Sequence, residues 1–199
     1  RRVLFRSGRC YALAAANLPS ARGQGEPLTS KLTPPAGSRF VEVLMGDDHQ
    51  AILLASQHGY GFISQLDSLE SNAKAGKSVV NLPERVEMLP VLRIPEGADR
   101  VAVLASSGRL LVYPLADLPV MSKGKGNKLI QIPPAKLKSG EEKVTAIACV
   151  RQGGELTLYC GARKITLSWR DLQAYEGTRA SRGHSLPRGF QRVDSVESN

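Results

Sequence analysis

An internal repeat with a period of about 50 residues limits the folds open to this chain more than any other feature. Four glycines mark a strand–turn–strand signal in successive repeats: Gly8, Gly59, Gly108 and Gly161. The intervals between these glycines are 51, 49 and 53 residues. A leucine follows each glycine after 10 or 11 residues, and the four are Leu18, Leu69, Leu118 and Leu172. A fixed period of this kind predicts an array of small units that bury each other's faces.

Each repeat contains about four short runs of alternating or continuous apolar residues and almost no helical pattern. The expected strands are residues 11–13, 28–32, 40–45, 51–55, 60–63, 78–82, 88–94, 100–105, 110–113, 129–132, 143–150, 156–160, 164–169 and 190–196. Four strands per unit predict an all-β, propeller-like array. A β-sandwich is the alternative, but it does not explain the period.

The repeat predicts one domain over residues 1–199 with four blades, at about residues 8–48, 49–97, 98–153 and 154–192. Residues 193–199 are expected to form a tail after the last blade, with a frayed end at residues 197–199. Residues 1–7 have two interpretations of equal weight. They are either a strand, since Val3-Leu4 aligns with Val103-Leu104, or a foreign segment similar to a translated adapter.

A basic, glycine-containing loop recurs after each leucine, at residues 22–25, 74–77, 123–126 and 179–183. Glycine permits positive φ and leaves backbone N–H groups uncovered, and successive N–H groups can form an anion-binding concavity. The lysines add full positive charge. A single loop of this kind could be an ordinary solvated turn, but its recurrence predicts a series of phosphate contacts.

The first-choice residues for phosphate binding are those of the recurring loops: Arg22, Lys74, Lys77, Lys123, Lys125, Lys128, Arg179 and Arg182. The second choices are Lys31, Arg109, Arg163 and Lys164. The net charge of +9 and a pI near 9.7 point to an acidic partner, of which nucleic acid is the commonest and an anionic membrane surface the second.

Other chemistry has little support in the sequence. Three cysteines without a Cys-x-x-Cys pair argue against a disulfide framework and for a reducing compartment. Residues 75–78 imitate the end of a phosphate-binding P-loop, but position 71 is Ser instead of the required Gly. The three histidines have no second ligand at metal spacing. Cys149, Cys160, Trp169 and Phe190 are expected to be packing residues.

Several segments closely resemble the C-terminal domain of the A subunit of bacterial DNA topoisomerase IV, and match it better than the paralogous domain of the DNA gyrase A subunit. They are residues 18–29 (LPSARGQGEPLT), 58–62 (HGYGF), 117–119 (DLP), 122–128 (SKGKGNK) and 163–165 (RKI). The resemblance covers residues 8–196. It implies a β-pinwheel, a ring of four-stranded blades that binds and bends duplex DNA along its basic outer rim.

The resemblance also implies a parent enzyme that decatenates and relaxes DNA with ATP and Mg²⁺. Its partners would be duplex DNA, the N-terminal core of the A subunit and the topoisomerase IV B subunit in an A2B2 heterotetramer, in the bacterial cytoplasm at the nucleoid or peripherally at the inner membrane. The chain itself is expected to hold no cofactor, metal or small-molecule substrate. None of its tyrosines has the Arg-Tyr context of the family's catalytic residue, so no cleavage activity is expected.

Nothing in the chain matches the gyrase wrapping box, a Gln-basic-Arg-Gly-Gly-basic-Gly run, so DNA bending is expected in place of full wrapping. The alternative function is a propeller-like protein-interaction platform whose charge serves solubility or an acidic protein partner. A steep dependence of DNA affinity on salt separates the two hypotheses.

Overall fold

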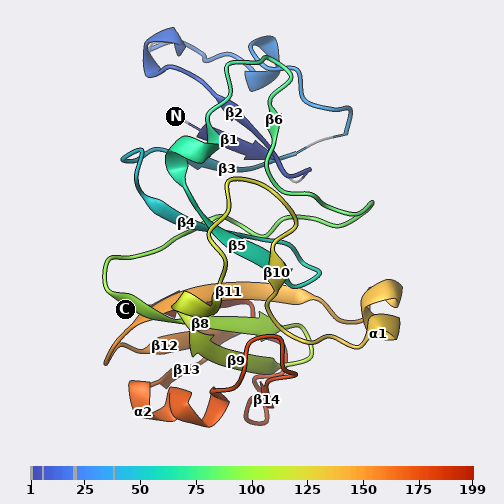
Figure 1. Cartoon of the computed structure of the whole chain (residues 1–199), viewed down its shortest axis with the longest axis vertical. Helices are drawn as coiled ribbons and strands as arrows, with labels where there is room; N and C mark the ends of the chain where they lie inside the picture. Colours follow the sequence, from blue (N-terminus) through green and yellow to red (C-terminus); the bar gives the residue numbers. More distant parts are fainter. Residues whose placement is uncertain (1, 6, 20–21, 38) are drawn as a thin grey trace.

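Four β-hairpins, one per repeat, form the centres of four separate sheets in the computed structural model, which describes residues 2–5, 7–19, 22–37 and 39–199 (Figure 1). The hairpins pair β1 (Arg2–Phe5) with β2 (Arg9–Ala12), β4 (Ala51–Ala55) with β5 (Tyr60–Gln65), β8 (Ala98–Ala105) with β9 (Arg109–Pro114), and β12 (Leu156–Cys160) with β13 (Arg163–Leu167). The four repeat-marking glycines are the turn residues of these hairpins, with φ between +56° and +78°. The sequence repeat is therefore marked by glycines, because each hairpin turn needs a residue that adopts positive φ.

The first strand of each hairpin pairs with an inner strand that comes later in the same repeat. These inner strands are β3 (Phe40–Leu44), β7 (Leu92–Arg93), β11 (Val144–Arg151) and β15 (Ser195–Ser198). The strand expected at residues 190–196 is found at 195–198 instead. The frayed end expected at residues 197–199 is wrong, because residues 195–198 pair antiparallel with β12 and Asn199 donates its N–H to the Glu155 carbonyl oxygen. Their backbone groups gain hydrogen-bond partners that a frayed end would lack.

The second strand of each hairpin pairs with an outer strand supplied by the following repeat. Strand β6 (Lys77–Ser78) pairs with β2, β10 (Asn127–Lys128) with β5, and β14 (His184–Ser185) with β9. The sheet orders are β3-β1-β2-β6, β10-β5-β4-β7, β11-β8-β9-β14 and β13-β12-β15. The predicted blade boundaries need correction here, since no sheet with an outer strand is built from one contiguous segment of the described residues.

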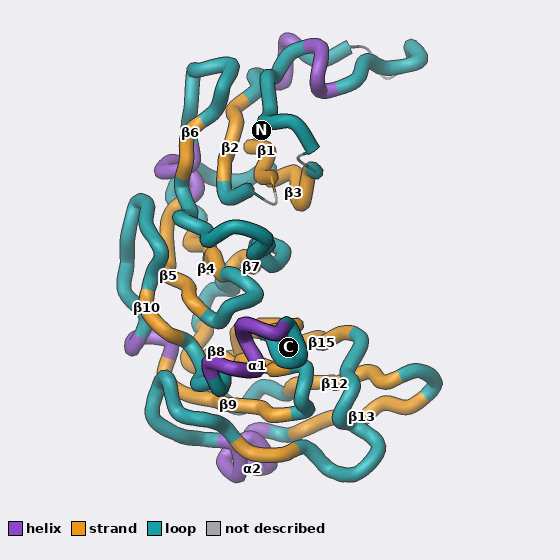
Figure 2. The backbone as a smooth tube through the Cα atoms, turned by 90° about the vertical axis from the view of Figure 1, so that its right-hand side faces the viewer, coloured by secondary structure: helices purple, strands orange, loops and turns teal. Residues whose placement is uncertain are grey.

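The sheets follow one another along an arc, with β6 and β10 on its outer side and β3, β7 and β15 on its inner side (Figure 2). The prediction of an all-β array with four blades of the pinwheel type is confirmed. The strand Arg2–Phe5 agrees with the first interpretation of residues 1–7, while Arg1 and Arg6 lie outside the described residues.

The core lies between successive sheets. Val101 and Val103 of β8 pack toward the second sheet, while Ala102 and Leu104 of the same strand pack toward the fourth. A third cluster joins the first and second sheets around Leu54 and contains residues of both. Because an interior sheet buries both faces, its central strands are continuous apolar runs, and this is why β4 and β8 were readily predicted.

Helices are short and lie at the ends of the sheets. They are η1 (Ala15–Asn17), η2 (Leu28–Ser30), η3 (Leu66–Leu69), η4 (Leu115–Asp117), α1 (Pro134–Ser139), α2 (Trp169–Leu172) and η5 (Gln173–Tyr175). The strand expected at residues 28–32 is wrong, because 28–30 form η2 and Leu32 packs on Tyr11. The strands expected at 78–82, 88–94 and 129–132 are replaced by two-residue pairings within longer loops.

Candidate nucleic-acid interface

Three of the four predicted basic loops, at residues 74–77, 123–126 and 179–183, lead directly into the outer strands β6, β10 and β14. The loop of residues 22–25 leads instead toward η2. Figure 2 shows that β6 and β10 lie on the outer side of the arc. Glycine is needed where each loop meets the neighbouring sheet. Gly126 has φ +78°, and a Cβ at this position would overlap the backbone of Gly61. A Cβ at Gly76 would lie 2.6 Å from the Tyr11 ring. These glycines allow the outer strand to approach the hairpin closely.

Two of the glycine N–H groups are used within the protein. Gly76 donates to the Ala73 carbonyl oxygen at 2.8 Å, and Gly124 donates to the Val79 carbonyl oxygen at 2.8 Å. The expectation that these glycines leave their N–H groups for an anion is therefore wrong at Gly76 and Gly124. Any positive field at these two positions comes from side chains.

The loop of residues 122–128 presents two exposed lysines and one that is partly buried. Lys123 and Lys125 are exposed, while Lys128 is half-buried and donates from Nζ to the Gln131 side chain at 3.1 Å. The Lys125 ammonium lies 3.9 Å from the centroid of the Tyr60 ring. This cation–π contact holds Lys125 at the edge of the second sheet without neutralising its charge.

His58, in the β4–β5 turn, lies beside this loop. Its burial lowers the pKa of the imidazole, and the positive charge of Lys125 lowers it further. Lys125 therefore lies close enough to His58 for its charge to act on the imidazole.

The loop of residues 74–77 contains one exposed and one tethered lysine. Lys74 is exposed. The Lys77 ammonium donates to the Ser68 carbonyl oxygen at 3.0 Å, which ties it to the end of η3. At this loop the Lys74 side chain is therefore exposed, whereas the Lys77 side chain is tied to the fold.

Sequence reasoning missed Arg9, which holds the same loop in place. Its guanidinium donates to the carbonyl oxygens of Ala75 and Gly76, each at 3.1 Å. Arg9 follows the hairpin glycine as Arg109 does, and Arg109 makes the same kind of bond to the Gly183 carbonyl oxygen at 2.9 Å. The Gly-Arg pair at residues 8–9 and 108–109 was the sequence signal for an arginine that holds an outer loop in place.

The loop of residues 177–185 uses its arginines internally. Arg182 makes two bonds to the Glu142 carboxylate, at 2.6 and 2.8 Å, and a third to the Gln131 carbonyl oxygen at 3.1 Å. Arg179 donates to the Lys128 carbonyl oxygen at 2.8 Å. Both arginines are half-buried, so charged hydrogen bonds fix this loop to β10 and to the segment between β10 and β11.

Glu142 is the buried partner of this arrangement, with 1% of its surface exposed. Burial by itself would raise the pKa of Glu142, but hydrogen bonds from Arg182 and Ser107, together with the Arg182 charge, outweigh burial and lower it. The carboxylate therefore stays ionised and holds the loop at neutral pH.

The remaining predicted cations are spread along the same chain of sheets. Arg22, Arg163 and Lys164 are exposed, and the last two lie on β13, at the outer edge of the fourth sheet. Lys31 is half-buried and pairs with Glu26 at 3.1 Å. Some of the predicted cations are therefore exposed, while others are hydrogen-bonded within the protein. Amino-acid composition does not distinguish the two groups.

Trp169, Phe190 and Cys149 take the packing roles expected of them, whereas Cys160 is half-buried and belongs to none of the core clusters of the described residues. Trp169 and Phe190 pack against the core between the third and fourth sheets, and Arg100 lies over the Trp169 ring at 5.5 Å. Cys149 is buried, and burial raises the pKa of its thiol to about 12. Within the described residues, no group of three or more His, Cys, Asp or Glu side chains could hold a metal ion. No helix in the same set is both long and apolar enough for a membrane span.

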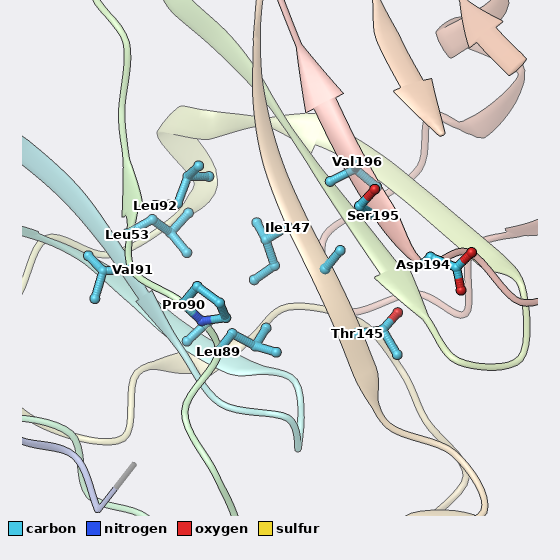
Figure 3. Close-up of a pocket in the computed structure, with 12 residues that line it drawn as sticks. Leu53, Leu89, Pro90, Val91, Leu92, Thr145, Ile147, Asp194, Ser195 and Val196 are labelled. Atoms are coloured by element: carbon cyan, nitrogen blue, oxygen red, sulfur yellow. The ribbon is translucent and has the colours of Figure 1, made fainter. Parts of the chain in front are cut away.

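A cavity of about 240 Å³ lies on the inner side of the arc, between β7, β11 and β15 (Figure 3). Leu92, Ile147 and Val196 contribute apolar walls. The single carboxylate among its lining residues, Asp194, already accepts the Gly161 N–H at 2.6 Å. The cavity therefore resembles a gap between blades and contains no pair of reactive groups among the described residues that line it.

Comparisons with known proteins agree with this architecture. The profile of the family described as "DNA gyrase C-terminal domain, beta-propeller" matches residues 50–107 and 99–151. The A subunit of DNA topoisomerase 4 from Pseudomonas aeruginosa is 45% identical over 193 residues, covering 96% of this chain and 25% of that protein. The chain thus spans about a quarter of the length of the curated relatives it matches.

Two solved structures show the fold. The structure of the E. coli ParC C-terminal domain superimposes with a TM-score of 0.92 at 42% identity, covering all of this chain and 80% of that one. A DNA gyrase A C-terminal domain superimposes with a TM-score of 0.70 at 11% identity, covering all of this chain and 64% of that one.

Proposed function

The chain belongs to the family of DNA gyrase C-terminal domains, and we propose that it binds duplex DNA along the outer side of its arc of sheets. The single observation that carries the proposal is the placement of exposed cations on the first, second and fourth sheets of the arc. Lys74, Lys123 and Lys164 are all exposed, and each lies in an outer loop or on an outer strand of a different sheet. Phosphates of one duplex, spaced regularly along a curved surface, would meet them in turn.

The binding would have weak sequence preference. In the described part of the chain, the outer side presents short strands and loops with flexible lysines, and it has no recognition helix that could enter a major groove. A curved series of phosphate contacts would favour DNA that bends easily, so selectivity would come from shape and deformability.

In the parent protein, this module would present a transported duplex to a type IIA topoisomerase core. We propose decatenation and relaxation of DNA with ATP and Mg²⁺, in an A2B2 assembly with the topoisomerase IV B subunit, in the bacterial cytoplasm at the nucleoid. Peripheral association with the inner membrane is part of the same proposal. ATP and Mg²⁺ would be held by the other parts of that assembly.

The test is duplex-DNA binding by the full chain across a salt series, measured by fluorescence anisotropy. Several phosphate contacts predict a loss of affinity of roughly a thousandfold between about 50 and 200 mM salt. In the variant Lys123→Ala with Lys125→Ala, the slope of log affinity against log salt should become shallower by about two.

The matched control removes the same charge elsewhere, with Arg151→Ala and Arg170→Ala. Both arginines are exposed, and neither lies in an outer loop. A folded chain that bound no DNA at low salt, or a control that lost as much slope as the lysine variant, would contradict the proposal and favour a protein-interaction platform.

A further inference from the structure

A second group of basic residues, three lysines and one histidine, lies at the hairpin-turn end of the second and third sheets, around α1. We call His58, Lys136, Lys138 and Lys143 the turn-side patch. Figure 1 shows α1 beside the turn between β8 and β9, on the opposite side of the molecule from α2. The three lysines are exposed, and His58 is half-buried. None of these lysines is among the predicted phosphate contacts.

The short helix α1 is oriented by its own sequence. Pro134 occupies its first turn, and Gly140 ends it in the left-handed conformation with φ 77°. Leu137 packs against the core shared by the second and third sheets. Because Lys136 and Lys138 flank Leu137, its burial directs the two lysines away from the core.

Lys143 is fixed against the turns of both sheets by backbone hydrogen bonds. Its N–H donates to the Ser106 side chain at 3.1 Å, and its carbonyl oxygen accepts the Ser106 N–H at 2.8 Å. The next residue, Val144, donates to the Gln57 carbonyl oxygen at 2.8 Å. The backbone of Lys143 is therefore held by the fold next to the β4–β5 turn that carries His58.

The patch keeps its positive charge although acidic residues are close. Arg182 already neutralises Glu142, which is buried beneath the patch. Glu141 is exposed, and Glu87 contacts Gln57 at 3.5 Å. No ion pair shorter than 4.0 Å joins any of the three lysines to a carboxylate among the described residues.

The patch is continuous with the outer loop of residues 122–128. Strand β10 at the end of that loop leads to α1 through only five residues, 129–133. Within that connection, the Gln131 side chain accepts a hydrogen bond from the Lys128 ammonium, and the Gln131 carbonyl oxygen accepts one from the Arg182 guanidinium. His58 lies close enough to Lys125 for the lysine's charge to lower the pKa of the imidazole. The two basic surfaces therefore meet at one corner of the second sheet.

We propose that the turn-side patch is a second phosphate-binding surface, which contacts the same duplex after it leaves the outer side of the arc near Lys125. The inference rests on the proposed DNA binding and extends its footprint to α1. A duplex long enough to pass this corner would gain up to three lysine–phosphate contacts that a short duplex would not make.

The test compares two duplexes, of about 12 and about 40 base pairs, on the full chain across a salt series. At roughly 3.4 Å per base pair, these are about 40 and 140 Å long. The variant Lys136→Ala, Lys138→Ala, Lys143→Ala should bind the short duplex as the wild type does. On the long duplex, its salt slope should be shallower by about two to three.

A matched control, Arg93→Ala with Arg151→Ala and Arg170→Ala, removes the same charge from exposed positions outside both surfaces and should leave both slopes unchanged. A wild-type slope on the long duplex for the lysine variant would overturn the inference. An equal loss on both duplexes would also overturn it, because the patch would then belong to the outer-side site.

The variant Lys123→Ala with Lys125→Ala separates this failure from failure of the proposed function. If this variant loses slope on both duplexes while the α1 variant loses none, only the extension to α1 is wrong. If the wild-type chain binds neither duplex, the proposed function fails and this inference fails with it. Thermal unfolding of each variant checks that the fold is retained.

Discussion

The loops of residues 122–128 and 177–185 differ in what their cations contact, although their sequences carry the same signal. Both are basic, both contain glycine at positive φ, and both deliver an outer strand to the preceding sheet. In the first loop, Lys123 and Lys125 remain exposed. In the second, Arg179 and Arg182 bond to carbonyl oxygens and to the buried Glu142. A basic loop therefore presents exposed cations in one sheet and is bonded to neighbouring segments in the next.

The difference lies in the acceptors that the neighbouring segment offers. Residues 128–142 present two backbone carbonyl oxygens and one buried carboxylate to the second loop. Arginine suits this role because its planar fork donates to several oxygens at once, whereas the lysines of the first loop are flexible point charges. Charge alone did not separate these cases, but residue type together with a buried acceptor does.

Loss of the Arg182–Glu142 ion pair should have the largest effect on stability. Arg182→Met leaves Glu142 buried with Ser107 as its remaining side-chain donor, and should lower the free energy of unfolding by about 3–4 kcal/mol. Urea denaturation at neutral pH measures this loss. Lys123→Met, in the other loop, should change stability by less than about 0.5 kcal/mol.

The double variant Arg182→Met with Glu142→Leu removes both charges and should recover most of the lost stability. Equal stabilities for Arg182→Met and the wild type would show that Arg182 contributes no more to stability than the exposed lysines of the first loop.

A more moderate loss is expected at the glycines that admit the outer strands. Gly126→Ala would force a Cβ against the Gly61 backbone at positive φ, and should cost about 2–3 kcal/mol. Gly25 has the same φ of +78°, but a Cβ there would meet no atom within 4 Å, so Gly25→Ala should cost only about 1 kcal/mol. Thermal or urea unfolding of the pair gives the difference. Equal costs would mean that close approach of β10 to the second sheet contributes nothing beyond backbone conformation.

The weakest of these perturbations concerns the cation–π contact that positions the exposed loop. Tyr60→Leu should lower the free energy of unfolding by about 0.5–1 kcal/mol, and Lys125→Ala in that background should add little further loss. A double-mutant cycle measures the coupling between the two residues. Additive effects would show that Lys125 is held by the backbone of its loop and not by the ring.

The repeat made the fold predictable at the level of units. The hairpins β4–β5 and β8–β9 were found because their strands are buried on both faces and their turns need glycine. The pairings of β6 and β10 were not found, since each consists of two residues and pairs with a strand about 66 residues away in the chain. A two-residue pairing leaves no periodic pattern for a sequence to reveal.

The candidate interface was predicted in outline and altered in detail. Lys74, Lys123, Lys125 and Lys164 are exposed where the basic pattern placed them. Arg182 was chosen on charge, but its partner Glu142 lies 40 residues earlier and is adjacent to it only in the folded chain. Lys136, Lys138 and Lys143 were passed over because their segment does not repeat.

The amino-acid sequence was sufficient to specify the number of sheets, the positions of the hairpin turns and the supply of positive charge. These depend on local requirements: glycine at positive φ, apolar runs in strands buried on both sides, and lysine and arginine content. Which cations face solvent and which are bound became clear only in the folded chain. That choice depends on acceptors such as Glu142 and on outer strands donated by the next repeat, and both arise from contacts between residues far apart in the chain.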